Sequence, residues 1–209
     1  MKNILNFREI INLYDGFIFD QFGVIHDGIK INREIEKCIS KIKNKNKKFY
    51  ILSNSGKSNV KNFERIAKMG TKKINSSDIV TSGDIFKNLL INQNYPFNKL
   101  GKKYYIIGKY DDLLTDTQYI ECSNLNDSDF LLLITLADYK NKDQVKIELK
   151  EGLNNNKKLV CVNPDVKGIH GNDISLSVGS IAQEYETSGG YVLYVGKPYL
   201  NSFNYILDL

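Results

Sequence analysis

Three short apolar runs in the first hundred residues alternate with amphipathic stretches, and this alternation limits the fold more than any other feature of the chain. Their β-branched and aromatic residues predict strands at residues 16–19, 48–52 and 78–80. Apolar residues at helical spacing predict helices at residues 32–42, 59–68 and 84–91. Strands that alternate with crossover helices form parallel sheets, so we predict an α/β protein.

The same alternation restarts after a polar, turn-forming segment at residues 92–98. It predicts further strands at residues 103–107, 129–135, 158–162 and 191–195. It predicts helices at residues 110–115, 142–153 and 180–187, and a last helical stretch from about residue 199. The two α/β blocks are similar in length, which favours two domains within the 209 residues.

Composition excludes several classes of protein. The chain is 42% hydrophobic and 25% charged, which is typical of globular proteins, and no run approaches the ~20 apolar residues of a membrane span. Cys38, Cys122 and Cys161 lie far apart, which favours neither a disulfide framework nor a metal site and predicts a cytoplasmic protein. The net charge of +5 is modest, and we interpret the basic run at residues 41–48 as a solvated helix end. We therefore expect neither a nucleic-acid nor a membrane partner.

Polar side chains follow the first two predicted strands, where parallel sheets commonly bind ligands. Asp20 ends the first strand, and burying an unpaired carboxylate there would cost several kcal/mol, so packing does not explain it. Ser53 and Asn54 end the second strand shortly before the helix at residues 59–68. A hydroxyl and an amide at this place can bind a phosphate, although the same residues would also suit a plain helix cap.

A lysine near the other end of the chain completes the set of candidates. Lys197 lies in the segment VGKP, between a predicted strand and a predicted helix. Its ammonium group could neutralise a carboxylate and a phosphoryl group together, although an isolated Gly-Lys-Pro more often holds a surface lysine.

Taken in this order, the segments resemble the haloacid dehalogenase-like (HAD) superfamily, and within it class IIA, the NagD-like hydrolases. The matching blocks span essentially the whole chain and are FIFDQFGVIHDG, FYILSNSGKS, DIVTSGD, YYIIGK, LVCVNPD and YVGKP. The resemblance implies a Rossmann-like core with a parallel sheet and an inserted α/β cap domain. We accordingly expect core residues 1–99, a cap at residues 100–190 and a return to the core at residues 191–209.

The resemblance also implies a catalytic centre. Asp20 would be the nucleophile that attacks phosphorus, and Lys197 would stabilise the charge on the carboxylate and the transferring group. Asp20 and the backbone carbonyl of Phe22 would bind Mg²⁺. The implied function is a magnesium-dependent phosphatase that acts on a small phosphorylated metabolite and that dimerises, if at all, through its cap.

Further residues are expected around the phosphate. Ser53 would bind the phosphoryl oxygens with the support of Asn54, and Gly23 would lie in the loop beside them. The NPD block brings Asn163 and Asp165 to the substrate side of the cap, where they would recognise the substrate or shape the loop.

The first departure from the family pattern is Phe22. Phosphatases of the superfamily carry an aspartate here as general acid and base, a role that typically contributes about 10²–10⁴ in rate. His26 and Asp27 could substitute, but we favour a loop-shaping role for both. Some carbon–halogen-cleaving members carry an aromatic residue at this position, which keeps a metal-independent dehalogenase as an alternative.

The second departure follows Lys197. The family's fourth motif adds acidic Mg²⁺ ligands from a later strand, whereas residues 198–209 form a single helical stretch. We therefore expect a core without its C-terminal strands and favour a truncated or split gene over a partner chain or a degenerate protein. Whether the chain is an active hydrolase or a non-catalytic phosphate-binding protein stays open at this point.

Overall fold

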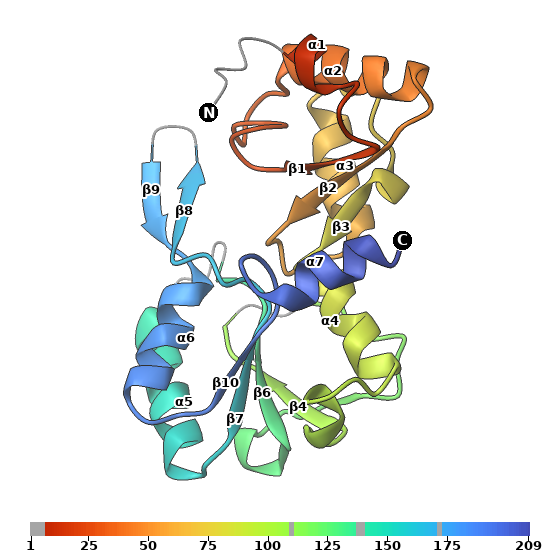
Figure 1. Ribbon diagram of the computed structural model, residues 1–209. Helices are drawn as coiled ribbons and strands as arrows, with labels where there is room; N and C mark the ends of the chain where they lie inside the picture. The colour runs from red at the N-terminus through yellow and green to blue at the C-terminus, as the bar shows by residue number, and fades with distance from the viewer. Residues whose placement is uncertain (1–6, 109–110, 137–140, 171–172) are drawn as a thin grey trace.

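The computed structural model describes residues 7–108, 111–136, 141–170 and 173–209. It contains two parallel sheets, one above the other in Figure 1, and a separate hairpin. The strands are β1 (Gly16–Asp20), β2 (Lys48–Ser53), β3 (Ile79–Thr81), β4 (Lys103–Ile106), β5 (Ile120–Glu121), β6 (Phe130–Leu133), β7 (Lys158–Cys161), β8 (Lys167–His170), β9 (Asp173–Leu176) and β10 (Val192–Tyr194). The α-helices are α1 (Phe7–Ile10), α2 (Arg33–Asn44), α3 (Asn59–Lys68), α4 (Ser82–Ile91), α5 (Lys142–Asn154), α6 (Val178–Thr187) and α7 (Leu200–Leu207). None of these described helices is long and apolar enough to cross a membrane.

The first sheet has the order β1-β2-β3, and its strands are parallel. Helices α2 and α3 cover one face, where their apolar residues form a buried cluster with Phe49 and Ile51 of β2. The helices begin at the capping residues that the sequence supplies: Asn32 accepts a hydrogen bond from Glu34 N, and Ser58 accepts one from Lys61 N. The first strand–helix block therefore forms as the apolar pattern predicts.

The second sheet has the order β10-β7-β6-β4-β5, again with parallel strands. Alternate residues of its central strands point to opposite faces, and both faces are buried. Helices α5 and α6 pack on one face around Leu131 and Leu159, and α4 and α7 pack on the other around Leu132 and Val160. Figure 1 shows this layering, with α5 and α6 on one side of the sheet and α4 and α7 on the other.

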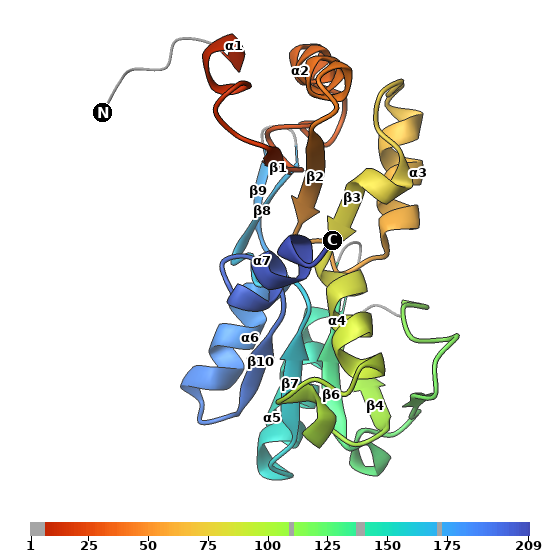
Figure 2. The same ribbon diagram turned by 45° about the vertical axis from the view of Figure 1, so that its right-hand side comes forward.

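The packing of α4 and α7 joins the two sheets. Their buried cluster contains Ile85 and Phe86 of α4 and Ile206 of α7, together with Leu52 of β2 and Val80 of β3 from the first sheet. One continuous apolar core thus connects both sheets. In Figure 2, β2 and β3 point down toward the second sheet, so the carboxyl ends of the first sheet face the second.

The structure changes two details of the predicted organisation. The sequence predicts that residues 191–209 return to the first domain, but β10 pairs with β7 and extends the second sheet. The sequence also predicts a helix at residues 110–115. Residue 110 lies outside the described residues, residues 111 and 112 have no regular secondary structure, and residues 113–116 form a turn. Asp111 Oδ1 accepts a hydrogen bond from Leu113 N, and this local bond competes with the helical pattern.

The hairpin of β8 and β9 has no counterpart among the predicted strands. It is antiparallel, with Lys167 opposite Leu176, and it leaves the second sheet and extends beside the first unit in Figure 1. Its short strands lack a long apolar run, which is why the pattern did not indicate them.

Candidate active site

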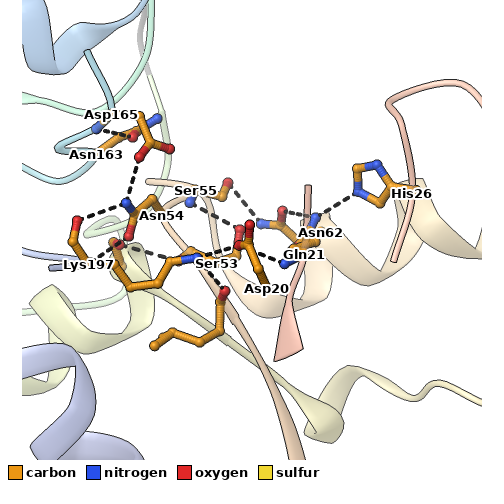
Figure 3. Close-up of polar contacts among 12 residues, drawn as sticks. Asp20, Gln21, His26, Ser53, Asn54, Ser55, Asn62, Asn163, Asp165 and Lys197 are labelled. Atoms are coloured by element: carbon orange, nitrogen blue, oxygen red, sulfur yellow. Dashed lines mark hydrogen bonds and ion pairs between the residues drawn. The ribbon is translucent and has the colours of Figure 1, made fainter. Parts of the chain in front are cut away.

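Asp20 and Lys197 meet between the two sheets. Asp20 is the last residue of β1, and its half-exposed side chain accepts hydrogen bonds at Oδ1 from its neighbour Gln21 N, at 2.8 Å, and from Lys197 Nζ. Lys197 Nζ also donates to the carbonyl oxygen of Leu52, the residue that pairs with Asp20 across the sheet, at 3.0 Å. The lysine is therefore held by one charged and one neutral acceptor. Figure 3 shows it reaching across to the end of β1.

The loop after β2 supplies the neighbouring polar groups. Ser53 and Asn54 are both 6% exposed. Ser53 Oγ accepts a hydrogen bond from Ser55 N at 3.2 Å, which leaves its own hydrogen free to donate to a ligand. The side chain of Asn54 points instead toward Lys197 and Asp165 (Figure 3).

The NPD block reaches the same place from the end of β7. Asp165 Oδ1 accepts a hydrogen bond from Asn54 Nδ2 at 2.8 Å, and Asp165 N donates to Asn163 Oδ1 at 3.0 Å. The loops after β1, β2, β7 and β10 thus converge, and we call this place the junction. It brings together the predicted residues Asp20, Ser53, Asn54, Asn163, Asp165 and Lys197.

The predicted metal ligands are a small donor set. Asp20 Oδ2 accepts no hydrogen bond within the described part of the chain, and Phe22 follows two residues later with its backbone carbonyl. Across the described ranges, no group of three or more histidine, cysteine, aspartate and glutamate residues could hold a metal ion. Mg²⁺ is often held by one or two carboxylates together with waters and a substrate phosphate, so these donors fit an ion that arrives with the substrate.

Phe22 and Gly23 lie in the loop that follows β1. Gly23 has φ of +81° and its N–H donates to the carbonyl of His26 at 2.8 Å, so the turn uses the freedom of glycine. The ring of Phe22 packs edge-on against His26, with centroids 5.2 Å apart, and the Arg65 guanidinium lies 5.9 Å from the Phe22 centroid. The position two residues after Asp20 thus holds an aromatic ring beside a cation.

The two candidate substitutes for the missing acid are engaged in the loop itself. His26 is 1% exposed, and its Nδ1 accepts a hydrogen bond from Gly28 N at 3.0 Å. Asp27 Oδ1 accepts hydrogen bonds from Ile29 N and Lys30 N, which lower the pKa of its carboxyl group. These contacts support the loop-shaping interpretation of both residues.

Sequence reasoning missed the polar support behind this loop. Gln21 and Asn62 are buried, and the Gln21 amide donates to Asn62 Oδ1 at 3.2 Å while its nitrogen lies 3.1 Å from His26 Nε2. Asn62 in turn donates to Ser55 Oγ at 3.1 Å, which links the loop after β1 to the loop after β2. A polar asparagine on the buried face of the helix at residues 59–68 was the available signal.

The buried histidine makes stability depend on pH. Burial, aided by Arg65 and opposed by Asp27 and Asp20, lowers the pKa of His26 from 6.5 to about 4. Between these values the unfolded chain binds a proton that the native protein does not, so the free energy of unfolding falls as the pH drops from 6.5 toward 4. The expected contribution is at most about 1.4 kcal/mol per pH unit. Urea unfolding of the wild type and His26→Gln at pH 5 and pH 7 measures it: the variant should lose this part of the dependence, and identical pH dependence in both proteins would contradict the prediction.

Gly196 lets the lysine loop approach the rest of the junction. Its φ is +127°, and a Cβ there would lie 2.6 Å from Ser82 Oγ, 2.7 Å from Pro164 Cδ and 2.8 Å from Asn54 Oδ1. We expect Gly196→Ala to lower the free energy of unfolding by about 1–3 kcal/mol in urea titrations. Gly189→Ala is the matched control, because Gly189 has a φ of +94° but open space around it. Equal losses in the two variants would show that close packing at residue 196 is unimportant.

Comparison with known proteins adds independent findings. A family model described as haloacid dehalogenase-like hydrolase matches residues 17–118. No curated protein matches the chain in sequence. Among solved structures, a possible sugar phosphatase from Cytophaga hutchinsonii has a TM-score of 0.82 and 19% identity, with 99% of this chain and 75% of that chain covered.

Two further structures show the same likeness. A 4-nitrophenylphosphatase from Thermotoga maritima has a TM-score of 0.76 at 18% identity and covers 95% of this chain and 74% of its own. NagD from E. coli has a TM-score of 0.73 at 21% identity, with 93% and 74% covered. The expected fold, a HAD-type arrangement with a second α/β unit, is confirmed.

Proposed function

Because a haloacid dehalogenase-like hydrolase model matches residues 17–118, we propose that this chain hydrolyses a small phosphate monoester through a covalent intermediate on Asp20. The observation that carries the proposal is the contact between Asp20 and Lys197, which are 177 residues apart in sequence. The ammonium group lies against the carboxylate and would offset the negative charge of an approaching phosphate.

The reaction divides into two displacements at phosphorus. An oxygen of Asp20 forms a bond to phosphorus while the bond between phosphorus and the leaving oxygen breaks, and the electron pair departs with that oxygen. Water then forms a bond to phosphorus, the bond to Asp20 breaks, and inorganic phosphate leaves.

The remaining polar groups would hold the phosphoryl group in place. The Ser53 hydroxyl has a hydrogen to donate, since its oxygen accepts from Ser55 N. Lys197 supplies a positive charge that is fixed by Leu52 O as well as by Asp20, so little reorganisation accompanies the reaction. Mg²⁺, when bound to Asp20 and the Phe22 carbonyl, would neutralise further charge on the phosphoryl oxygens.

Because residue 22 is a phenylalanine and not an acid, we expect the chain to prefer esters with particular leaving groups. Among the described residues near the loop, His26 and Asp27 are occupied by backbone donors, so neither is placed to protonate a leaving oxygen. General acid catalysis typically contributes about 10²–10⁴ in rate, and its loss matters most for poor leaving groups. The chain should therefore favour esters whose alcohol is acidic, such as phenols.

The test of the proposed function is turnover of p-nitrophenyl phosphate by the purified chain. We expect release of p-nitrophenolate that increases with added Mg²⁺ and stops with EDTA. A labelled phosphoryl group should be trapped on the protein by acid quenching and be released by hydroxylamine, as acyl phosphates are. Binding of vanadate without any turnover or trapped label would contradict hydrolysis and favour the non-catalytic phosphate-binding protein.

A further inference from the structure

The side chain of Asn54 is committed entirely to protein partners. Its Oδ1 accepts a hydrogen bond from Lys197 N at 2.6 Å, and its Nδ2 donates to Lys197 O at 2.9 Å and to Asp165 Oδ1 at 2.8 Å. An amide nitrogen carries two hydrogens, so both are used. The Asn54 side chain therefore has no hydrogen to offer a phosphate, which favours the supporting role that the resemblance implies over direct phosphate binding.

These bonds hold the backbone of Lys197 from both sides. The amide of Asn54 pairs with the N–H and the C=O of the same residue, as a neighbouring strand would. The backbone of Lys197 is fixed directly before its side chain extends to Asp20 and Leu52 O. A shift of that backbone would move Nζ away from the carboxylate.

Asp165 strengthens the preference of the Asn54 amide for the orientation that pairs with the Lys197 backbone. An asparagine amide can rotate by half a turn, which exchanges its oxygen and its nitrogen. The rotated amide of Asn54 would place Oδ1 against the Asp165 carboxylate and its NH₂ group against the Lys197 N–H, so both contacts would become repulsive. The ionised carboxylate accepts hydrogen bonds only, and it therefore favours the observed orientation.

Asp165 is itself held by its own loop. Its N–H donates to Asn163 Oδ1, which shapes the turn after β7. Since β7 is the neighbour of β10 in the second sheet, Asp165 and Lys197 reach Asn54 from adjacent strands. The loops after β7 and β10 of the second sheet thus both form hydrogen bonds with Asn54, which follows β2 of the first sheet.

We propose that Asp165 is a positioning residue that acts through the Asn54 amide to aim Lys197 at Asp20. The catalytic role of Lys197 rests on the proposed function, whereas the effect of Asp165 on the Lys197 backbone does not. The chief alternative is that Asp165 contacts the substrate directly.

The test compares Asp165→Ala and Asp165→Asn with the exposed control Asp127→Ala. Alanine removes the acceptor, so we expect kcat for p-nitrophenyl phosphate to fall by about 10- to 100-fold with KM changed by less than about 3-fold. Asparagine can present its own Oδ1 to Asn54 Nδ2, so Asp165→Asn should recover kcat to within about 5-fold of the wild type. The control should behave as the wild type does.

A second measurement is independent of activity. In protein labelled with ¹⁵N-lysine, the Lys197 backbone amide should shift upfield in Asp165→Ala, because its hydrogen bond to the less firmly held Asn54 amide is weakened, and it should stay in place in Asp165→Asn and Asp127→Ala. An unchanged Lys197 signal in Asp165→Ala would overturn the proposal, whether or not the wild type is active. A rise in KM with unchanged kcat, in both variants at residue 165, would overturn it in favour of direct substrate contact. If the wild type shows no turnover but the Lys197 signal shifts as expected in Asp165→Ala, the proposed function is refuted and the positioning role of Asp165 is not.

Discussion

Turnover of p-nitrophenyl phosphate is expected to disappear when Asp20 is replaced by asparagine. The amide oxygen is a poor nucleophile, and it cannot balance the charge of Lys197, so the loss should be on the order of 10³-fold or more. The fold should survive, because the Asp20 side chain is half exposed and an amide oxygen can still accept the hydrogen bond from Gln21 N. Steady-state kinetics with matched circular dichroism spectra would measure the effect.

The control for Asp20→Asn is the same substitution at the opposite end of the strand. Asp15 is exposed and directly precedes β1, so Asp15→Asn removes the same charge without touching the junction. It should leave kcat within about 2-fold of the wild type. Turnover that survives in Asp20→Asn at the wild-type rate would refute a phospho-aspartate at this residue.

The largest expected loss of stability comes from Ile85 in α4. Its side chain is 0% exposed and belongs to the core that joins both sheets. Replacement by alanine removes buried methylene and methyl groups and leaves a cavity, so the free energy of unfolding should fall by about 2–5 kcal/mol. Since small domains have only about 5–15 kcal/mol in total, urea titration should show a large shift of the midpoint.

Ile91 in the same helix provides the matched control, because its side chain is 52% exposed. Ile91→Ala should change the free energy of unfolding by no more than about 0.5 kcal/mol.

The shared core also implies that both sheets unfold together, so fluorescence and circular dichroism should give coincident transitions in the wild type. Equal effects at residues 85 and 91, or separate transitions, would contradict the continuous core described above.

Local patterns were enough to predict most elements. The helix predicted at residues 59–68 matches α3, and the helix at residues 142–153 differs from α5 by one residue. Long amphipathic segments carry their own periodicity, so neighbouring elements add little to the prediction. The helix predicted at residues 110–115 is absent from the described residues 111–115, where Asp111 bonds Leu113 N and both Asp111 and Asp112 form ion pairs with the distant Lys61 of α3.

Some residues of the candidate site could likewise be found from local sequence, and others could not. Asp20, Ser53 and Asn54 could be found at the ends of predicted strands, because the position of a residue at a strand end is local information. The roles of Gln21 and Asn62 could not, since their hydrogen bond links residues 41 apart. The resemblance named Asp165, but only the structure joined it to Asn54.

The sequence by itself determined the strand–helix alternation, the parallel sheets and the polar residues at their carboxyl ends, because each depends on residues that are close along the chain. Tertiary structure alone decided that β10 belongs to the second sheet and that α4 and α7 join both units in one core. A strand of three residues fits either sheet until its neighbours are in place. The same packing brought Lys197 to Asp20, and it placed the Asn54 amide against the backbone of that lysine.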